Sequence, residues 1–578
     1  MGLDFSNLNS LWAGVMVETL VRLGLRSAVI CPGSRSTPLT VALARHPKIK
    51  TIPILDERSA AFFALGLAKS SGLPTVLVCT SGTAGANFYP AVIEAYQSAV
   101  PLIILTGDRP PELRDCHSGQ TIDQIKLFGT FAQWFSEMAT PLGTVEMLRY
   151  ARQTIVQAWR RSQFPQKGVV HLNCPFRDPL APTPNDSVTH LKQVIKADFF
   201  AGIQPQEKAE FSSDILPTEV WKNYSRGLIV AGVDQPSDPD DYAAAIAQLS
   251  GYLSFPILAE ALSPVRNYAH YFPQGLVTTY DFILRDQKLA ETLKPEIVIQ
   301  IGALPTSKIL RAWLEAQQIQ TYILSERADN FDPLHRPHQH LAVNLRTLKY
   351  LGIFSDNEKG LPYFDLWQTQ EAKIRTKLVA VFQAEQNLNE AAIAYCLARA
   401  LPEQTAIFFA NSMVVRYGEF FWQLNDKQIL PYFNRGANGI DGTLSTALGV
   451  AENHSPCVLL TGDLALLHDT NGFLTLSKFT GSLTIIVINN QGGGIFEMLP
   501  IAGEKDIFED YFATPQTVHF SQLCDLYGVQ YQTIRTKTEL IQACENLPTQ
   551  GVQLLEIRTD RHQDIAWLKE LCQSFSAS

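Results

Sequence analysis

The sequence lacks the defining features of several protein classes. Its longest purely apolar runs, such as residues 99–105, fall far short of the about 18 residues that a membrane-spanning helix needs. No basic stretch followed by an apolar run stands at the N-terminus, so no secretory signal is expected. Lys and Arg number 47 against 56 Asp and Glu, and the net charge of −9 disfavours wrapping of nucleic acid. We therefore expect neither a membrane span nor a nucleic-acid partner.

Cysteine is scarce and scattered. The nine cysteines form no Cys-x-x-Cys pair and their number is odd, which argues against a disulfide framework and against a zinc site. Reduced, buried thiols are typical of a cytoplasmic protein, which is the location we expect.

What remains is the composition of an ordinary globular protein, with 46% hydrophobic and 18% charged residues in a chain of 578. At about 150 residues a domain, this length predicts roughly four domains, or three large ones. Short apolar runs alternate with amphipathic helical patterns in three regions, which is typical of parallel sheets built from βαβ units. The fold class predicted is therefore α/β, with three doubly wound parallel-sheet domains.

The predicted elements divide among these regions. In the first we expect strands over 27–31, 51–55, 75–79, 101–106 and 168–172, with helices over 37–45, 59–69 and 84–97. In the second we expect strands over 227–231, 296–301 and 321–324, with helices over 241–248 and 308–316. In the third we expect strands over 406–410, 457–461, 483–488 and 552–557, with helices over 390–400 and 442–450. The predicted domains are 1–185, 221–355 and 389–578, joined by linkers over 186–220 and 356–388.

Two strand ends of the third region carry the strongest chemical signal. Asp463 follows one strand, and Asn490 follows another 27 residues later, before Gly492 to Gly494. Both ends should lie at the carboxyl edge of one parallel sheet, where α/β proteins bind ligands. A carboxylate, an amide and a backbone carbonyl are hard oxygen ligands that suit Mg²⁺, and nearby glycines let backbone N–H groups approach a diphosphate. Each half alone is equally typical of a helix cap or a turn, but the pair favours a site.

Glu57 directly follows a strand of the first region. Taken alone, it is more often a carboxylate at a helix N-terminus that the helix dipole favours.

Together these motifs resemble those of the thiamine-diphosphate enzymes. The resemblance implies Mg²⁺, or Mn²⁺ in its place, bound by Asp463, Asn490 and the Gly492 carbonyl. Leu464 stands where that family usually has glycine, and this departure matches one of its subfamilies. Glu57 would hydrogen-bond the cofactor's aminopyrimidine ring, so that the cofactor becomes its own base. The architecture implied is the pyruvate-decarboxylase-like one: a pyrimidine-binding, a central Rossmann-like and a diphosphate-binding domain.

Longer motifs resemble one branch, the menaquinone-pathway synthases that make 2-succinyl-5-enolpyruvyl-6-hydroxy-3-cyclohexene-1-carboxylate. These motifs are residues 31–39, 80–84, 108–115, 411–416, 434–442 and 494–500. The branch decarboxylates 2-oxoglutarate and adds the succinyl semialdehyde carbanion equivalent to isochorismate in a Stetter-like 1,4-addition. The products are the carboxylate and CO₂, on the route to menaquinone or phylloquinone. Both substrates are dianions, which arginine suits because its planar fork binds both carboxylate oxygens.

The resemblance implies roles for particular residues. Catalytic roles fall to Glu57, Ser412, Arg416 and Arg435. Cofactor contacts fall to Pro32, Thr83, Asn87, Ile440, Gly462, Asp463, Leu464, Asn490, Gly492, Gly493 and Ile495. Substrate contacts fall to Ser34, Arg35, Arg109, Gln120, Lys308, Ser412, Arg416, Arg435, Phe496 and Leu499. The same resemblance implies self-association as a homodimer or tetramer, with Glu57 and Asp463 of one site coming from different chains.

One position departs from the branch, which often has arginine directly after the central-domain lysine. Here Ile309 follows Lys308, and Arg311 stands a full helical turn further on. The nearest alternative function is another thiamine-diphosphate 2-oxoacid decarboxylase or an acetolactate-synthase-like carboligase, although a pyruvate site would not need this many arginines. A non-catalytic scaffold is disfavoured by intact Glu57, Asp463 and Asn490. A nucleotide-binding protein is disfavoured because both glycine-rich phosphate loops are missing.

Overall fold

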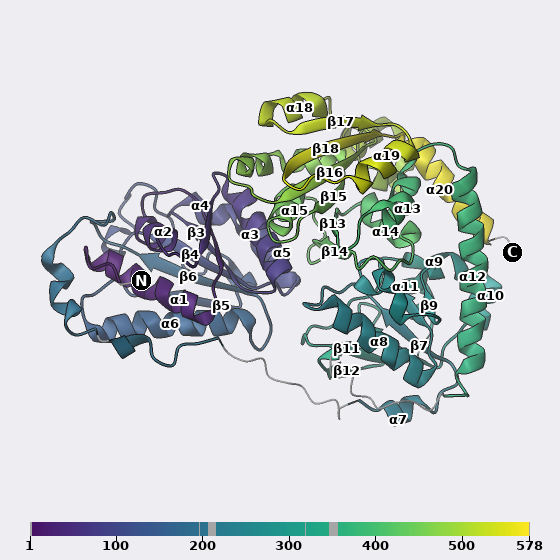
Figure 1. The fold of residues 1–578 in the computed structure, drawn as a ribbon, viewed down its shortest axis with the longest axis horizontal. Coiled ribbons are helices and arrows are strands. Elements are labelled where there is room, and N and C mark those ends of the chain that lie inside the picture. Colours follow the sequence, from purple (N-terminus) through teal and green to yellow (C-terminus); the bar gives the residue numbers. More distant parts are fainter. Residues whose placement is uncertain (1–2, 196, 206–215, 318, 346–356, 577–578) are drawn as a thin grey trace. The chain divides into compact units, whose positions relative to one another are not determined.

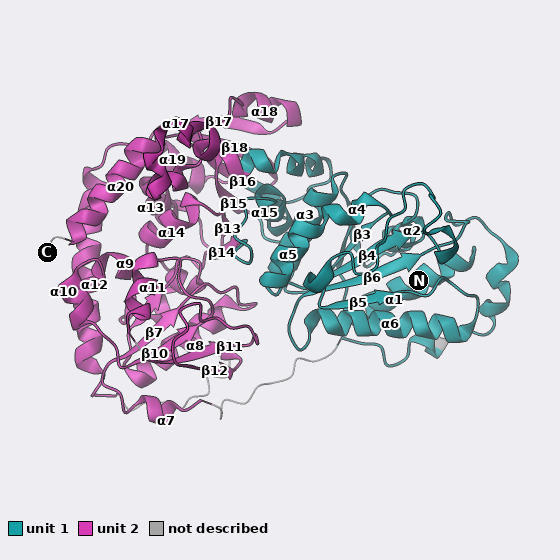
Figure 2. Cartoon of the chain, turned by 180° about the vertical axis from the view of Figure 1, so that it is seen from behind, with its two compact units in different colours: residues 1–208, 434–455, 466–483 teal, residues 209–433, 456–465, 484–578 magenta. Residues whose placement is uncertain are grey.

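A computed structural model describes residues 3–195, 197–205, 216–317, 319–345 and 357–576 of the chain. Three six-stranded sheets follow one another along the chain (Figure 1), as the α/β interpretation predicts. By compactness the chain forms two units, which Figure 2 colours separately. Unit 1 comprises residues 1–208, 434–455 and 466–483, and unit 2 comprises residues 209–433, 456–465 and 484–578.

The first sheet lies in unit 1 and has the strand order β2-β1-β3-β4-β6-β5. Every neighbouring pair in it is parallel. Its strands are β1 (Ser27–Ile30), β2 (Lys50–Pro53), β3 (Thr75–Cys79), β4 (Leu102–Asp108), β5 (Trp134–Glu137) and β6 (Val169–Pro175). Its helices are α1 (Leu8–Leu23), α2 (Thr37–Ala44), α3 (Glu57–Ser71), α4 (Thr83–Asn87), α5 (Tyr89–Gln97) and α6 (Val145–Gln163).

The predicted single helix over 84–97 is wrong, because the structure has two helices there, α4 and α5. Pro90 lies in the first turn of α5. A proline is well placed in a first turn but cannot continue a preceding helix, because it lacks the N–H group that the helix needs. The break is therefore a consequence of this residue.

The second sheet lies in unit 2, with the order β12-β11-β10-β7-β8-β9 and parallel neighbours throughout. Its strands are β7 (Gly227–Ala231), β8 (Ile257–Ala259), β9 (Leu276–Val277), β10 (Ile297–Ile301), β11 (Gln320–Ser325) and β12 (His338–Ala342). Its helices are α7 (Thr218–Trp221), α8 (Pro239–Leu253), α9 (Tyr280–Ile283), α10 (Gln287–Thr292) and α11 (Lys308–Glu315). The long helix α12 (Leu361–Ala384) occupies most of the predicted linker 356–388. Residue 356 of this linker, and residues 196 and 206–215 of the predicted linker 186–220, lie outside the described residues.

The third sheet has the order β14-β13-β15-β16-β18-β17. Its strands are β13 (Ala406–Phe409), β14 (Leu430–Phe433), β15 (Cys457–Gly462), β16 (Ser482–Asn489), β17 (Gln530–Ile534) and β18 (Gly551–Arg558). Its helices are α13 (Glu390–Ala400), α14 (Met413–Phe421), α15 (Thr443–Ala451), α16 (Asp463–His468), α17 (Lys505–Phe508), α18 (Phe520–Tyr527), α19 (Lys537–Glu545) and α20 (Arg561–Ser576). Unit 2 also holds the core that the second and third sheets share, which includes the fully buried Trp367 and Trp422.

Within unit 1, helix α3 crosses α15 at close range. A Cβ atom on Gly66 would lie 2.1 Å from the Thr446 carbonyl oxygen, and one on Gly449 would lie 2.1 Å from the Phe63 carbonyl oxygen. Only glycine fits at these two positions, because any side chain would push the helices apart. The crossing fixes helix α3, whose N-terminus carries Glu57.

All nine cysteines carry free thiols. No helix among the described residues is both long and apolar enough to span a bilayer.

Candidate active site

The strand-end motif of the third sheet forms a tightly bonded loop in unit 2. Asp463 begins α16 directly after β15, and its two carboxylate oxygens accept backbone N–H bonds from Leu464 and Gly492, both at 2.8 Å. Gly492 lies in the loop after β16, which neighbours β15 in the sheet. The structure therefore brings the two halves of the sequence motif together, as the topology argument predicts.

Glycine is required at position 492. Its φ of +134° lies in a region that side chains rarely adopt, and a Cβ atom there would lie 2.3 Å from the Ala513 carbonyl oxygen. Its own carbonyl accepts the Gly494 N–H at 2.9 Å and keeps a second lone pair. At Gly462, by contrast, a Cβ atom would meet nothing within 4 Å, so open space adjoins Asp463.

The Asn490 side chain tests whether a divalent cation fits this loop. Its Nδ2 donates to the Glu390 carboxylate at 2.6 Å, whereas its buried Oδ1 has no hydrogen-bond partner. A buried acceptor without a partner is costly and asks for an explanation. Asp463 is also buried, and burial raises its pKa to about 6 despite the two N–H bonds that it accepts. A carboxylate, an orphaned amide oxygen and a backbone carbonyl together fit the oxygen ligands of Mg²⁺.

Glu57 is the first residue of α3 and lies within reach of the ends of β1 and β3. Asp56 caps the helix by accepting the Ser59 N–H at 2.8 Å. Burial raises the pKa of the Cys79 thiol, and the negative charge of Glu57 raises it further. The same charge contributes, after burial and Cys79, to the raised pKa of Cys31. Glu57 therefore lies close to the carboxyl end of the first sheet.

Two arginines of unit 1 converge beside Ser81. The Arg109 guanidinium donates to the Ser81 hydroxyl, and the Gln120 side chain donates to the Ser81 carbonyl at 3.0 Å. The Arg35 backbone N–H donates to the Thr80 hydroxyl at 3.2 Å, which holds the loop after β1 against the loop after β3. Burial, and then the nearby positive charge of Arg109, lower the pKa of Arg35.

The Arg35 side chain is only partly satisfied. Its exposed fraction is 8%, and its Nη1 donates to the Phe176 carbonyl at 2.9 Å. Its Nε is buried without a hydrogen-bond partner, and its closest ion-pair contact, to Asp178, is 4.0 Å long. Two neighbouring guanidinium groups with an unsatisfied donor have the charge and the donor geometry that suit an anion.

Ser412 and Arg416 begin helix α14 in unit 2. The backbone of Ser412 has a φ of +69°, and the Arg416 guanidinium donates to the Ser412 carbonyl. Positive φ at a residue other than glycine stores strain that is commonly found at functional sites. Gln120, Asn438 and Gln491 share this property, and each lies in or beside a motif that the sequence analysis singles out.

The remaining predicted residues divide between the units. In unit 1, the exposed Asn87 donates to the Thr83 carbonyl at 3.2 Å within helix α4, and Pro32 and Ser34 are also exposed. Arg435 and Ile440 are half-buried in the same unit. In unit 2, Ile495 packs against the core, Phe496 packs edge-on against Phe512, and Leu499 is exposed. Gly493 donates its N–H to the Ala513 carbonyl at 2.8 Å.

No arginine directly follows the central-domain lysine, Lys308. Lys308 is the exposed first residue of α11, whereas Ile309 packs against the hydrophobic core. Arg311 is occupied within its own loop, because its guanidinium donates to the carbonyls of Leu304 and Pro305 at 3.1 and 2.7 Å. It therefore does not replace the arginine that the resemblance implies directly after Lys308.

Three residues that support these loops belong to none of the motifs found in the sequence. Glu94 on α5 accepts the backbone N–H groups of Gly436 and Ala437 at 3.0 and 2.7 Å, and so holds the loop after Arg435. Arg561 donates to the Gln491 carbonyl at 2.8 Å and pairs with Glu497 and Glu509. Glu390 holds Asn490. For Glu94 and Glu390, the only hint in the sequence is an acidic residue at a helix position that is expected to be buried.

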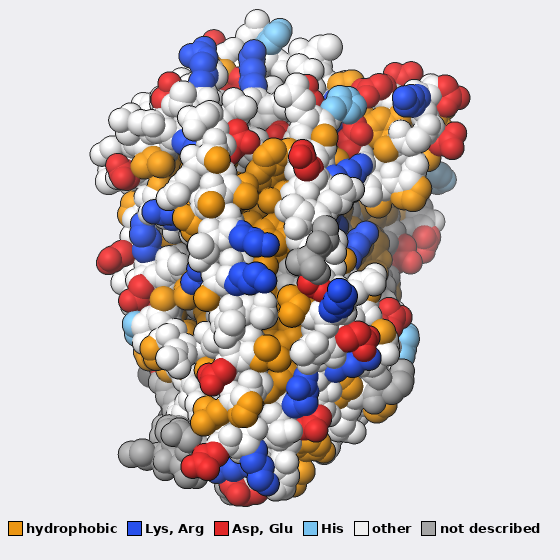
Figure 3. Space-filling view, turned by 90° about the vertical axis from the view of Figure 1, so that its right-hand side faces the viewer, with side chains coloured by type: hydrophobic (Ala, Val, Ile, Leu, Met, Phe, Trp, Pro, Cys, Tyr) orange, Lys and Arg blue, Asp and Glu red, His pale blue; other side chains and the backbone are white. Residues whose placement is uncertain are grey.

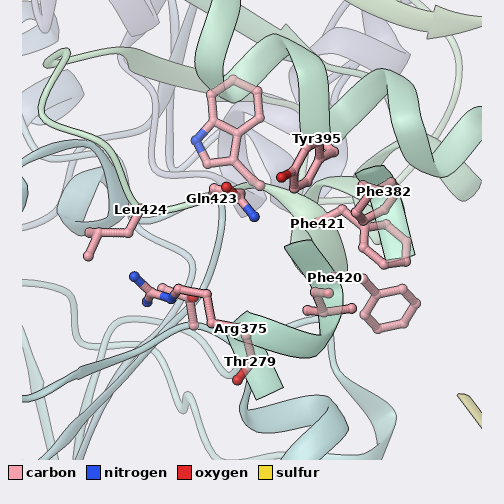
Figure 4. Close-up of a pocket in the computed structure, with 11 residues that line it drawn as sticks. Thr279, Arg375, Phe382, Tyr395, Phe420, Phe421, Gln423 and Leu424 are labelled. Carbon is pink, nitrogen blue, oxygen red and sulfur yellow. The ribbon is translucent and has the colours of Figure 1, made fainter. Parts of the chain in front are cut away.

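Two other features are not part of this site. Glu497, Glu509 and His562 could together approach one metal ion, but Arg561 already pairs with both carboxylates. A separate pocket of unit 2 contains none of the predicted site residues (Figure 4). It is lined by Thr278, Thr279, Arg375, Leu378, Phe382, Tyr395 and residues 420–424. On the face that Figure 3 draws, acidic and basic side chains are interspersed.

Comparison with known proteins agrees with this arrangement. The N-terminal TPP binding domain of thiamine pyrophosphate enzymes matches residues 12–127, their middle domain matches 204–409, and their C-terminal TPP binding domain matches 412–557. A 2-succinyl-5-enolpyruvyl-6-hydroxy-3-cyclohexene-1-carboxylate synthase of Gloeothece citriformis is 55% identical over 100% of both chains. Synthases of the same name from Crocosphaera subtropica and Microcystis aeruginosa are 52% and 54% identical, covering 100% and 98% of this chain and 99% of each relative. The chain therefore belongs to the 2-succinyl-5-enolpyruvyl-6-hydroxy-3-cyclohexene-1-carboxylate synthase family of thiamine pyrophosphate enzymes.

Proposed function

We propose that this protein condenses 2-oxoglutarate with isochorismate, releasing CO₂ and 2-succinyl-5-enolpyruvyl-6-hydroxy-3-cyclohexene-1-carboxylate for menaquinone or phylloquinone synthesis. The observation that carries the choice of substrates is Arg35, buried beside Arg109 with an unpartnered Nε. A cationic pair with one buried and one half-buried guanidinium favours a dianion over pyruvate, which has a single carboxylate. The free thiols fit a reaction carried out in the cytoplasm.

Thiamine diphosphate, when bound, supplies a nucleophilic carbon and holds the electron pair that CO₂ leaves behind. In our proposal, Asp463, Asn490 and the Gly492 carbonyl hold Mg²⁺, with Mn²⁺ as its substitute, and thereby the diphosphate. Glu57 hydrogen-bonds the pyrimidine ring and favours the tautomer that acts as a base.

The chain's cations would then position the two dianions. Ser412, Arg416 and Arg435 bind 2-oxoglutarate, and Ser34, Arg35, Arg109, Gln120 and Lys308 bind isochorismate in this proposal. Ile440, Ile495, Phe496 and Leu499 supply apolar walls that exclude water from the reacting carbon. Pro32, Thr83 and Asn87 contact the cofactor from the first domain.

The substrate assignment predicts the effect of replacing Arg35 by lysine. Lysine keeps the positive charge but loses the fork, so we expect the KM for isochorismate to rise about 10- to 100-fold, the range of one charged hydrogen bond. The KM for 2-oxoglutarate and the affinity for thiamine diphosphate should stay near the wild-type values. Steady-state kinetics with each substrate varied in turn measure this. Arg45→Lys, at an exposed arginine of the same unit, is the control. An unchanged KM for isochorismate would remove Arg35 from the site.

We further propose a homodimer, or a tetramer made of two such dimers, in which each active site takes Glu57 from one chain and Asp463 from the other. Mixing Glu57→Gln and Asp463→Ala subunits then creates one intact site in each mixed dimer. Random reassociation of equal amounts should recover about a quarter of wild-type activity, although each variant alone is nearly inactive. Recovery is measured after denaturing and refolding the mixture together. If both groups of a site came from one chain, the mixture would stay inactive.

A further inference from the structure

The Asn490 amide is held from one side only. Its Nδ2 donates to the Glu390 carboxylate at 2.6 Å, and its Oδ1 is buried without a partner. An ionised carboxylate only accepts hydrogen bonds, so with Glu390 ionised the pairing fixes which end of the amide faces Glu390 and which end stays free. The direction of the free oxygen is thus decided by a residue one hundred positions away in the sequence.

Glu390 is itself firmly anchored. It is the first residue of α13, a helix that Asn389 caps by accepting the Ala392 N–H at 2.8 Å. The exposed fraction of Glu390 is only 3%. The Thr559 hydroxyl, directly after β18, donates to the same carboxylate oxygen at 3.3 Å. The Glu390 carboxylate accepts from Asn490 and from Thr559, which lie in separate elements. Turning this buried group away from Asn490 would cost it these hydrogen bonds.

We propose that Glu390 is the positioning residue of the magnesium site. It fixes the Asn490 amide so that Oδ1 is available to the cation, and so sets the affinity for Mg²⁺ without touching the metal or the cofactor. The inference rests on the proposed function, in which Asn490 is a magnesium ligand. Outer partners of metal ligands typically contribute about 10- to 100-fold in metal affinity.

The chain offers a matched comparison one residue earlier. Asn489 donates its Nδ2 to the Glu556 carboxylate, also at 2.6 Å, and Glu556 is equally buried. This pair joins the same two groups at the end of the same strand, with Glu556 also paired to Arg558 at 3.1 Å, but Asn489 is not among the predicted ligands. Replacing Glu556 therefore shows the effect of losing a buried carboxylate near the sheet edge. Replacing Glu390 shows in addition the effect of releasing Asn490.

The test measures binding rather than turnover. Glu390→Gln removes the charge and lets the new amide compete for Asn490, and Glu390→Asp keeps the charge but withdraws it by one methylene. Calorimetry measures the binding of thiamine diphosphate at a series of Mg²⁺ concentrations. For both variants we expect the same cofactor binding to need about 10- to 100-fold more Mg²⁺ than in the wild type. Saturating Mg²⁺ should restore cofactor binding. The cofactor-free variants should unfold within about 3 °C of the wild type.

Glu556→Gln, the control, should change the Mg²⁺ requirement less than about twofold, below the range of an outer metal partner. The inference is overturned if either folded Glu390 variant binds like the wild type, or if Glu556→Gln loses as much as they do. If Asp463→Ala also left Mg²⁺-dependent binding unchanged, the proposed metal site itself would fail. If Asp463→Ala abolished binding and the Glu390 variants did not, only the role of Glu390 would fail.

Discussion

Replacing Glu57 by glutamine should lower turnover by about 100- to 10,000-fold, the range that one acid–base group contributes. Glutamine fills the same volume at the N-terminus of α3 but cannot stabilise positive charge on the pyrimidine ring. The cofactor would bind and remain unactivated. Steady-state turnover together with calorimetric cofactor affinity measures both halves of this expectation, namely a large loss of kcat and a small change in Kd.

Helix α6 provides the control for Glu57. Glu146 is likewise an acidic residue in the first turn of a helix of unit 1, and it is exposed. If Glu57 merely complemented the helix dipole, Glu146→Gln and Glu57→Gln would have similarly small effects, each about 0.3–1 kcal/mol of stability. Near wild-type turnover of Glu57→Gln would remove its catalytic role.

Replacing Asp463 by alanine should weaken Mg²⁺-dependent binding of thiamine diphosphate by more than about 100-fold, above the usual range for outer partners. Two effects combine, because alanine removes a metal ligand and also releases the Gly492 N–H that Asp463 holds at 2.8 Å. Titration calorimetry with and without Mg²⁺ separates metal-dependent from metal-independent affinity. Only the metal-dependent part should be lost.

Asp506 supplies the comparison for Asp463. It is an exposed aspartate in the first turn of α17 in the same unit, so Asp506→Ala removes the same charge away from the strand ends. We expect it to leave cofactor affinity unchanged. Wild-type affinity in Asp463→Ala would mean that the strand-end motif is a structural loop only.

The interior strands of the three sheets could be predicted from sequence, except the three-residue β8, because continuous apolar runs such as those of β3 and β10 are a strong signal. Five of the six strands at the sheet edges could not. β5 is half-buried along its whole length, and β12 and β17 alternate exposed residues with few buried ones. An edge strand has one neighbour and needs fewer apolar residues, so the pattern of these three resembles that of a loop. The other two missed edge strands, β9 and β14, are buried but only 2 and 4 residues long, too short for a clear periodic signal.

The candidate site shows a similar limit. The placing of Asp463 and Asn490 is predictable because neighbouring parallel strands of the third sheet deliver their carboxyl ends to one edge. The role expected of Glu57 comes from the family resemblance instead. The supports of Asp463 and Asn490 are not predictable, because Glu390 and Arg561 reach the same loop from opposite ends of the third sheet's sequence. No local spacing reports such a contact. Only the folded chain shows that the Asn490 amide has a partner at one end and none at the other.

The central claim is the conversion of isochorismate with carbon from 2-oxoglutarate. The most direct measurement incubates the purified protein with thiamine diphosphate, Mg²⁺, isochorismate and either 2-oxoglutarate or pyruvate. It follows isochorismate absorbance and CO₂ release and identifies the product by mass spectrometry. The account predicts equal amounts of isochorismate consumed and CO₂ released with 2-oxoglutarate, and neither with pyruvate. Consumption that did not need 2-oxoglutarate, or that ran equally well with pyruvate, would contradict it.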